Sequence, residues 1–197
     1  MDFFDYFQAV FLLVFYFIFI GRTIQLILAG KNPIVLGVGK KGFRAIFELS
    51  LLVGLSIWTF EVAANCLGFK FHLFSDTRLF SVVFLRIVGV AMEIVGMAIF
   101  AAAIFSFGAS WRVGIDKKSP GDLVTGGVFS ISRNPIFLFL DIIFWGTFLI
   151  YPTLFFGISA VVVILGNHFQ ILQEERFLDG EYGDDYLAYK KRVRRYF

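Results

Sequence analysis

Apolar runs of membrane-spanning length recur along this chain and restrict it to folds that a lipid bilayer accepts. A helix needs about 20 apolar residues to cross the hydrocarbon core, where backbone polar groups must be satisfied within the structure. The sequence therefore predicts an all-α fold, a polytopic membrane bundle of about five transmembrane helices with a C-terminal cytoplasmic helical lobe. The expected spans are residues 7–29, 44–67, 79–107, 136–150 and 153–171.

The composition and the length support a single membrane domain. The mean hydropathy is +0.80, with 58% hydrophobic and 17% charged residues, which lies outside the range of soluble domains. Five helices and one polar lobe use nearly all 197 residues, so one domain is expected over 1–197. Its first part, 1–107, would hold three helices, and 108–197 a loop, a helical hairpin and a tail. The first run is too long for a signal peptide, and acidic Asp2 and Asp5 precede it, so we expect a retained helix.

Several kinds of site are disfavoured by what the sequence contains. Cys66 is the single cysteine, which excludes an intramolecular disulfide and a cysteine-based metal site. His72 and His168 are far apart and lack metal-ligand spacing, so we expect no metal. The net charge of +3 is modest and does not suggest nucleic acid. The expected surroundings are a lipid bilayer.

Basic residues are concentrated in alternate connections between the expected spans. Most of the 18 Lys and Arg residues lie in the first loop, the third loop and the tail, and the short turn at Tyr151-Pro152 has none. The positive-inside rule then places the N-terminus outside and the C-terminus in the cytoplasm. Pro152 stands where one helix must stop and the next can begin, which predicts a tight helical hairpin.

Six ionisable residues lie within or at the ends of the expected spans. An ionised group there costs several kcal/mol unless it is paired or hydrated. These side chains should therefore face the bundle interior or an interface, either in ion pairs between helices or along a polar pocket or path. The six are Arg22, Glu48, Glu61, Arg86, Glu93 and Asp141.

Residues 37–42 match the G-x-G-x-x-G pattern of dinucleotide-binding loops. That interpretation requires a βαβ unit with an acidic residue about 20 positions further on. Here a membrane span follows at once, and Glu61 lies inside it. A basic loop near lipid headgroups is the favoured interpretation.

Polar residues gather in the last third of the chain. The segment 123–129 leads into Arg-Asn-Pro at 133–135, and a Glu pair follows at 174–175 after the hairpin. Pro early in a helix and charges where a helix leaves the membrane are also ordinary features. However, such a helix start presents free N–H groups that suit a carboxylate or phosphate, and Arg133 adds to that preference. Gln170 lies four residues before the first Glu of the pair, on the same helical face.

These elements together resemble the C-terminal half of the isoprenylcysteine carboxyl methyltransferase family, over roughly residues 108–195. The similarity rests on the order and spacing of Leu-Val-Thr-x-Gly-x-Phe, Arg-Asn-Pro-x-Phe, a helical hairpin, Glu-Glu, and Gly-Asp-Asp-Tyr at 183–186 with Tyr189. The resemblance implies an integral membrane methyltransferase with S-adenosylmethionine as cofactor and a cytoplasmic active site. The implied acceptor is a prenylcysteine-like carboxylate or another lipophilic or small molecule.

The resemblance also implies roles for particular residues. Backbone N–H groups at the helix start would hold the methionyl carboxylate, Glu174 the amino group or ribose hydroxyls, and Phe129 with Phe137 the adenine. Arg112 and Arg133 are the expected catalytic residues. The expected cofactor-binding residues are Asp122, Leu123, Val124, Gly127, Phe129, Asn134, Pro135, Ile136, Phe137, Gln170, Glu174 and Glu175.

The chain departs from the family pattern where the acceptor is concerned. Asn134 replaces a common His, Phe129 and Phe137 replace Tyr, and Gln170 replaces the Arg of the prenylcysteine enzymes. Gln170 weakens the case for a prenylcysteine carboxylate, and Arg112 is the candidate cation in its place.

Methyl transfer from a sulfonium is an in-line displacement that depends on alignment in a dry pocket, and a carboxylate or thiolate acceptor needs no general base.

Two other functions remain open from the sequence. Membrane sterol-type reductases, which use NADPH, resemble the C-terminal architecture but usually have more spans. A non-enzymatic transporter or scaffold would use the polar cluster as a structural lock. The acceptor also stays open among prenylated cysteine, a lipid, a thiol and a small amphiphile, and the sequence carries no indication of oligomeric state.

Overall fold

A computed structural model of the chain describes residues 1–31, 33, 43–108 and 121–196. Within these ranges the chain forms five α-helices and a short 3₁₀-helix, η2, so the predicted all-α class is confirmed. The Gly-rich segment 37–42 and Arg112 lie outside the described residues, as does the side chain of Glu48. The elements are α1 (Phe3–Leu28), α2 (Phe43–Leu67), α3 (Val83–Phe107), η2 (Gly127–Ser130), α4 (Pro135–Ile150) and α5 (Leu154–Arg192).

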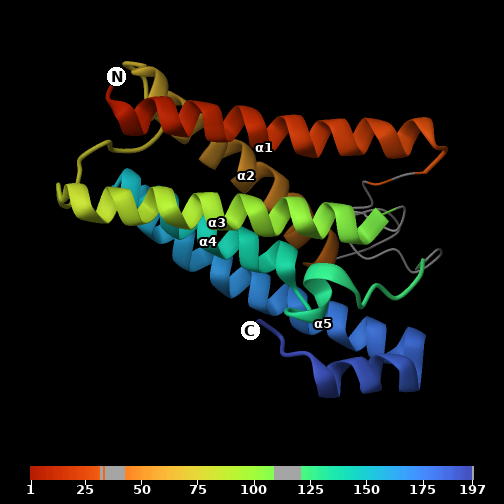
Figure 1. Ribbon diagram of the computed structural model, residues 1–197. Helices are drawn as coiled ribbons and strands as arrows, with labels where there is room; N and C mark the ends of the chain where they lie inside the picture. The colour runs from red at the N-terminus through yellow and green to blue at the C-terminus, as the bar shows by residue number, and fades with distance from the viewer. Residues whose placement is uncertain (32, 34–42, 109–120, 197) are drawn as a thin grey trace.

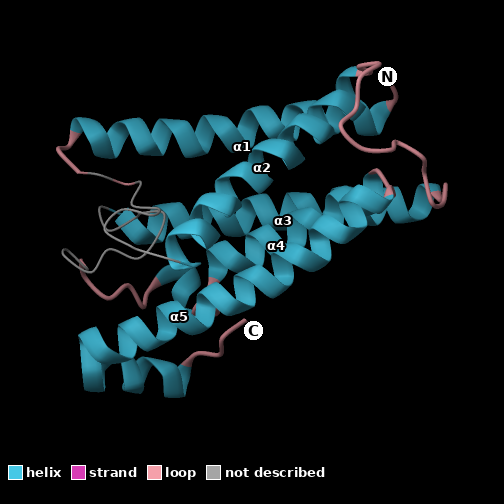
Figure 2. Cartoon of the chain, turned by 180° about the vertical axis from the view of Figure 1, so that it is seen from behind, coloured by secondary structure: helices cyan, strands magenta, loops and turns pink. Residues whose placement is uncertain are grey.

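The helices form an elongated bundle and run alternately up and down (Figure 1). Four segments are long and apolar enough to cross a membrane, namely α1, α3, α5 and residues 49–67 of α2. The fifth helix, α4, is apolar but has only 16 residues. The colours of Figure 1 show that η2 and the beginning of α4 lie at the same end of the bundle as the last turns of α1 and α3, and Figure 2 shows the bundle from behind. This end is called the lobe end below, because α5 also continues past it.

Glycines allow α3 and α4 to pack closely. A Cβ on Gly89 would lie 2.6 Å from the carbonyl oxygen of Gly146, and a Cβ on Gly146 would lie 2.7 Å from Cγ of Glu93. Small residues at helix crossings let the backbones approach, which is how helices commonly pack in membranes. The two helices therefore form a rigid pair, and this pair positions both the hairpin and the lobe end.

The hairpin between α4 and α5 forms where the sequence predicts it. α4 ends at Ile150, and Thr153 caps α5 by accepting a hydrogen bond from the N–H of Phe156. The expected third span, 79–107, was too long at its start, because α3 begins at Val83. The N–H of Leu79 instead donates to the carbonyl of Pro152 at 2.7 Å, which ties this segment to the hairpin turn.

α5 extends well beyond a bilayer thickness and then changes direction. Residues 154–182, before the break at Gly183, correspond to about 44 Å of helix at 1.5 Å per residue. The backbone is non-helical at Gly183, with φ 50° and ψ −123°, so the helix is broken there. The segment after the break runs back beside α5 (Figure 1), and Lys190 pairs with Asp179 at 2.8 Å.

The ionisable groups of the spans whose side chains the structure describes find partners on other segments, as predicted. Glu93 of α3 is fully buried and accepts hydrogen bonds from Gln8 at 2.7 Å and Thr147 at 2.8 Å. Arg86 donates to Asp2 at 2.7 Å, an ion pair between α3 and the start of α1. These contacts join α1, α3 and α4 across apolar surroundings, where an unpaired polar group is costly.

The close contact between α3 and α4 leads to a test of the packing. We expect Gly89→Ala to lower stability by about 1–3 kcal/mol, the usual cost of overpacking, because its Cβ must displace the backbone of Gly146. Gly54→Ala in α2 is the matched control, since nothing lies within 4 Å of a Cβ there. The measurement is the thermal unfolding midpoint of the detergent-solubilised protein. Equal midpoints for the two variants would contradict the close packing.

Candidate active site

A tight glycine turn places η2 against the end of α3. Gly127 has φ +60°, which L-residues with a side chain rarely adopt, and a Cβ there would collide with the hydroxyl of Ser106. Two residues later Phe129 is buried, and its ring packs edge-on against Phe107 of α3 with centroids 4.6 Å apart. The turn therefore holds the segment that the family resemblance singles out directly over the last turn of α3.

The N-terminus of α4 is not capped by a side chain. Pro135 occupies the first turn, and the preceding Asn134 makes no side-chain bond to the helix. The amide of Asn134 donates instead to the carbonyl of Arg195 at 3.1 Å, and its backbone N–H donates to the Ser132 hydroxyl at 3.2 Å. Among the described residues, the first N–H groups of α4 therefore have no side-chain acceptor, which makes this helix start suitable for an anion.

Glu175 joins three segments through two guanidinium groups. Its Oε1 accepts from Nη2 of Arg133 at 2.6 Å, and its Oε2 accepts from Nη2 of Arg195 at 2.8 Å. The Glu175 side chain is only 5% exposed, so both bonds are charge-assisted and shielded from water. The hydrogen bonds that Arg195 donates to Glu175 raise the pKa of Arg195 above its usual range, which keeps that guanidinium charged. Arg133, Glu175 and Arg195 are called the Glu175 cluster below.

Arg133 also fixes the C-terminal tail by its remaining donors. Its Nη1 donates to the carbonyls of Lys190 at 3.0 Å and Val193 at 3.1 Å. Its backbone N–H donates to the carbonyl of Arg194 at 3.1 Å. The segment in front of α4 therefore holds the tail along the α4 start, and the guanidinium of Arg133 is engaged in structure on both Nη atoms.

A second hydrophobic core covers this end of the bundle. Tyr186, Tyr189 and Val193 of the segment after Gly183 are buried against Phe129 and Ala103. The hydroxyl of Tyr189 donates to the carbonyl of Phe129 at 2.7 Å. The role of this segment was missed in the sequence, although the spacing of Tyr182, Tyr186, Tyr189 and Val193 marks one helical face in a charged tail.

Contacts between α4 and α5 bring Gln170 beside the start of α4. Asn167 donates to Asp141 at 2.7 Å. Further along α5, nearer the lobe end, Glu175 pairs with Arg133. Gln170 lies between these two contacts on α5 and is 6% exposed. No hydrogen bond involves its amide within the described part of the chain.

The structure gathers most of the predicted site residues at the lobe end. Leu123, Val124 and Ile136 pack against the second core, in which Phe129 is buried, and Phe137 and Glu174 are half-buried. Asp122 and Gly127 are exposed, and Asn134 and Pro135 are buried at the α4 start. Their roles toward a cofactor stay predictions. No group of three or more His, Cys, Asp or Glu residues is placed to hold a metal ion in the described ranges.

The helices and a family match together define a multi-pass membrane methyltransferase. The family model described as phospholipid methyltransferase matches residues 84–185, more than half of the chain. The chain belongs to the phospholipid methyltransferase family, whose integral membrane members include isoprenylcysteine methyltransferase-like proteins, so the resemblance found in the residues is confirmed. The match runs from α3 to just past Gly183.

A short bacterial protein is also similar to part of this chain. It is an uncharacterized protein of Haemophilus influenzae, 34% identical over 59 residues. The aligned part covers 30% of this chain and 92% of that protein.

The Glu175 cluster makes Arg195 important for holding the tail. We expect Arg195→Gln to lower the free energy of unfolding by about 1–2 kcal/mol, because Oε2 of a buried carboxylate loses its charged partner while partial exposure of Arg195 moderates the loss. Arg194→Gln is the matched control, since Arg194 is exposed and no side-chain bond of Arg194 occurs within the described residues. Unfolding by denaturant in detergent measures both variants, and equal destabilisation would argue against the cluster.

Proposed function

We propose that this protein transfers a methyl group from S-adenosylmethionine to a lipophilic acceptor at the lobe end of the bundle. The observation that carries the proposal is the position of the uncapped α4 N-terminus beside the buried amide of Gln170, inside the family-matched segment. Both groups supply hydrogen bonds that a charged cofactor needs and that no side chain of the described residues takes up.

The groups around the α4 start fit the chemistry of S-adenosylmethionine. Its carboxylate suits the N–H groups of Ile136 and Phe137, which lie at the positive end of the helix dipole. The amide of Gln170 and the carboxylate of Glu174 offer acceptors for its amino group or ribose hydroxyls. Leu123 and Val124 supply half-buried apolar surface. When bound, S-adenosylmethionine supplies a methyl group on a sulfonium, which an oxygen or sulfur nucleophile can attack directly.

In this proposal Arg133 and Glu175 are positioning residues. Both Nη atoms of Arg133 are engaged by Glu175 and by tail carbonyls, so its charge is already balanced. Their ion pair holds the start of α4 at a set distance from α5, and thereby the two walls of the cofactor site. Alignment of the acceptor with the methyl group in a dry pocket is what such rigidity supplies. Arg112 keeps its proposed role as a cation for the acceptor.

The acceptor that we propose is a carboxylate on a lipophilic molecule, of which a prenylcysteine is one example. A carboxylate attacks the methyl carbon without first losing a proton, and the electron pair of the breaking C–S bond stays on sulfur. We further propose that the lobe end faces the cytoplasm, where the basic connections lie, and that the N-terminus is outside. The charged cofactor then enters from water and the acceptor from the bilayer.

Ligand binding provides the direct test of the cofactor. We expect the purified, detergent-solubilised protein to bind S-adenosylmethionine and to show no comparable binding of NADPH, as measured by isothermal titration calorimetry. Gln170→Ala should weaken binding of S-adenosylmethionine by roughly 2–10-fold, the value of one hydrogen bond. Preferential binding of NADPH would favour a reductase, and binding of neither ligand would favour a transporter or scaffold.

The glycine turn provides a second test that separates neighbouring positions. We expect Gly127→Ala to weaken binding of S-adenosylmethionine by about tenfold, or 1.4 kcal/mol, because the left-handed backbone and the contact with Ser106 both oppose a side chain. Gly126→Ala is the control, since nothing lies within 4 Å of a Cβ at Gly126. The same calorimetry measures both affinities. Unchanged affinity in Gly127→Ala would remove the turn from the cofactor site.

A further inference from the structure

The helices α1 and α3 run parallel in one constant register. Near the middle of the bundle Gln8 bonds to Glu93, 85 positions further along the chain. At the lobe end Arg22 donates to the carbonyl of Gly108, 86 positions further along. Because the offset is preserved over about four helical turns, the surface between these helices is one continuous strip that leads from mid-bundle to the lobe end.

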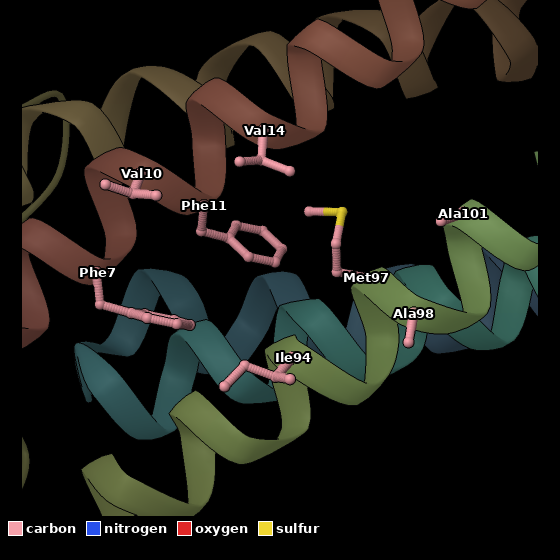
Figure 3. A pocket seen from close by; sticks show the side chains of 8 residues that line it. All are labelled: Phe7, Val10, Phe11, Val14, Ile94, Met97, Ala98 and Ala101. Atoms are coloured by element: carbon pink, nitrogen blue, oxygen red, sulfur yellow. The ribbon is translucent and has the colours of Figure 1, made fainter.

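An apolar groove of about 310 Å³ occupies this strip. Figure 3 shows Phe11 and Val14 of α1 and Met97 of α3 around it, and its walls are apolar throughout. Ala98 and Ala101 leave room where larger side chains would close the gap. The volume lies at the lower end of ligand pockets, which range over roughly 300–1,000 Å³, and suits one hydrocarbon chain. The groove is lined by Phe7, Val10, Phe11, Val14, Ile94, Met97, Ala98 and Ala101.

Arg22 provides a cation on the same strip, about two helical turns beyond Val14, the last groove residue of α1. Arg22 lies about three helical turns after Phe11 and on nearly the same face of α1, since the two differ by about 20° around the helix axis. Gly108 has the same relation to Met97. The Nη1 of Arg22 donates to the exposed Gln25 side chain, a neutral partner. No carboxylate forms an ion pair with Arg22 within the described residues. Arg22 can therefore exchange Gln25 for an anion, which binds about twice as strongly.

The end of α3 beyond the groove adjoins the candidate active site. Gly108 directly follows Phe107, whose ring packs on Phe129, and Ser106 contacts the turn at Gly127. A headgroup held at Arg22 therefore lies next to η2. A second apolar hollow, lined in part by Phe74, Phe155 and Ile158, lies near the hairpin at the opposite end and has no such connection.

We propose that the α1–α3 groove binds the hydrocarbon chain of a single-chain anionic lipid and that Arg22 binds its headgroup. This proposal rests on the proposed function, because it makes that lipid the methyl acceptor and gives it a route from the bilayer to the cofactor. The apolar walls select the chain, and the charge of Arg22 selects an anionic headgroup. Arg22 is thus a specificity-determining residue outside the segment 108–195 that resembles the methyltransferases.

Photolabelling of the intact protein tests the groove without requiring catalysis. The protein in neutral phosphatidylcholine nanodiscs is irradiated with a long-chain fatty acid that carries a diazirine on its chain, and mass spectrometry locates the adducts. We expect adducts within residues 7–14 of α1 and 94–101 of α3, and at least fivefold less of them with the fatty amine of the same chain. Adducts spread evenly over the lipid-facing surfaces, or equal labelling by acid and amine, would overturn the proposal.

Variants separate the groove from general lipid contact. Ala101→Trp should abolish the groove adducts, and Arg22→Gln should remove the preference for the acid over the amine. Leu13→Trp is the control, since Leu13 is 71% exposed and is not a groove residue. If Ala101→Trp fails to fold, Ala101→Leu gives a graded loss, and undiminished labelling in either folded variant contradicts the groove.

Calorimetry on the same preparations separates this proposal from the proposed function. Retained binding of S-adenosylmethionine with no groove adducts would overturn the lipid site alone. Groove adducts without any binding of S-adenosylmethionine would overturn the methyltransfer proposal and leave a lipid-binding groove.

Discussion

The lobe end of this membrane protein depends on one carboxylate, Glu175, that is held between two guanidinium groups. A buried carboxylate loses its hydration, and only close, hydrogen-bonded cations offset that loss. Here the cations come from Arg133 in front of α4 and from Arg195 in the tail, so the electrostatic requirement of one side chain joins three segments. The start of α4, the last part of α5 and the tail therefore take up their positions together.

The same constraint acts in the apolar part of the bundle, where water cannot satisfy polar groups. Oε1 of Glu93 accepts from Gln8 and Thr147, and Arg86 pairs with Asp2, so each of these groups joins α3 to a neighbouring helix. Close packing at Gly89 then keeps α3 and α4 at a fixed separation. This rigid pair carries η2 at one end of α3 and the hairpin at the far end of α4.

The arrangement separates the two substances that the proposed reaction brings together. The uncapped start of α4 and the amide of Gln170 lie at the lobe end, where in our proposal the charged cofactor arrives from water. The groove between α1 and α3 lies among exposed apolar residues, on the strip that continues to Arg22. The two routes meet near Gly108, which adjoins the turn before η2. A methyl transfer between a polar donor and a lipid acceptor needs such a meeting point at the edge of the bilayer.

The sequence alone determined the features that depend on neighbouring residues. Apolar length set the helices, Tyr151-Pro152 set the hairpin, and Gly183 set the break in α5, because helix formation and its interruption are local properties of the backbone. The order and spacing of short motifs were also enough to indicate the methyltransferase family.

Only the tertiary structure decided which groups meet. The sequence marked Arg133 as a cation for an anion, but not that Glu175 and tail carbonyls engage it, nor that Arg195 completes the cluster. The burial of Phe129 under Tyr189, and the groove between α1 and α3, likewise join segments that are far apart in the chain. Such contacts depend on how whole helices pack, and helix packing follows from the combined shape and charge of several segments rather than from any one of them.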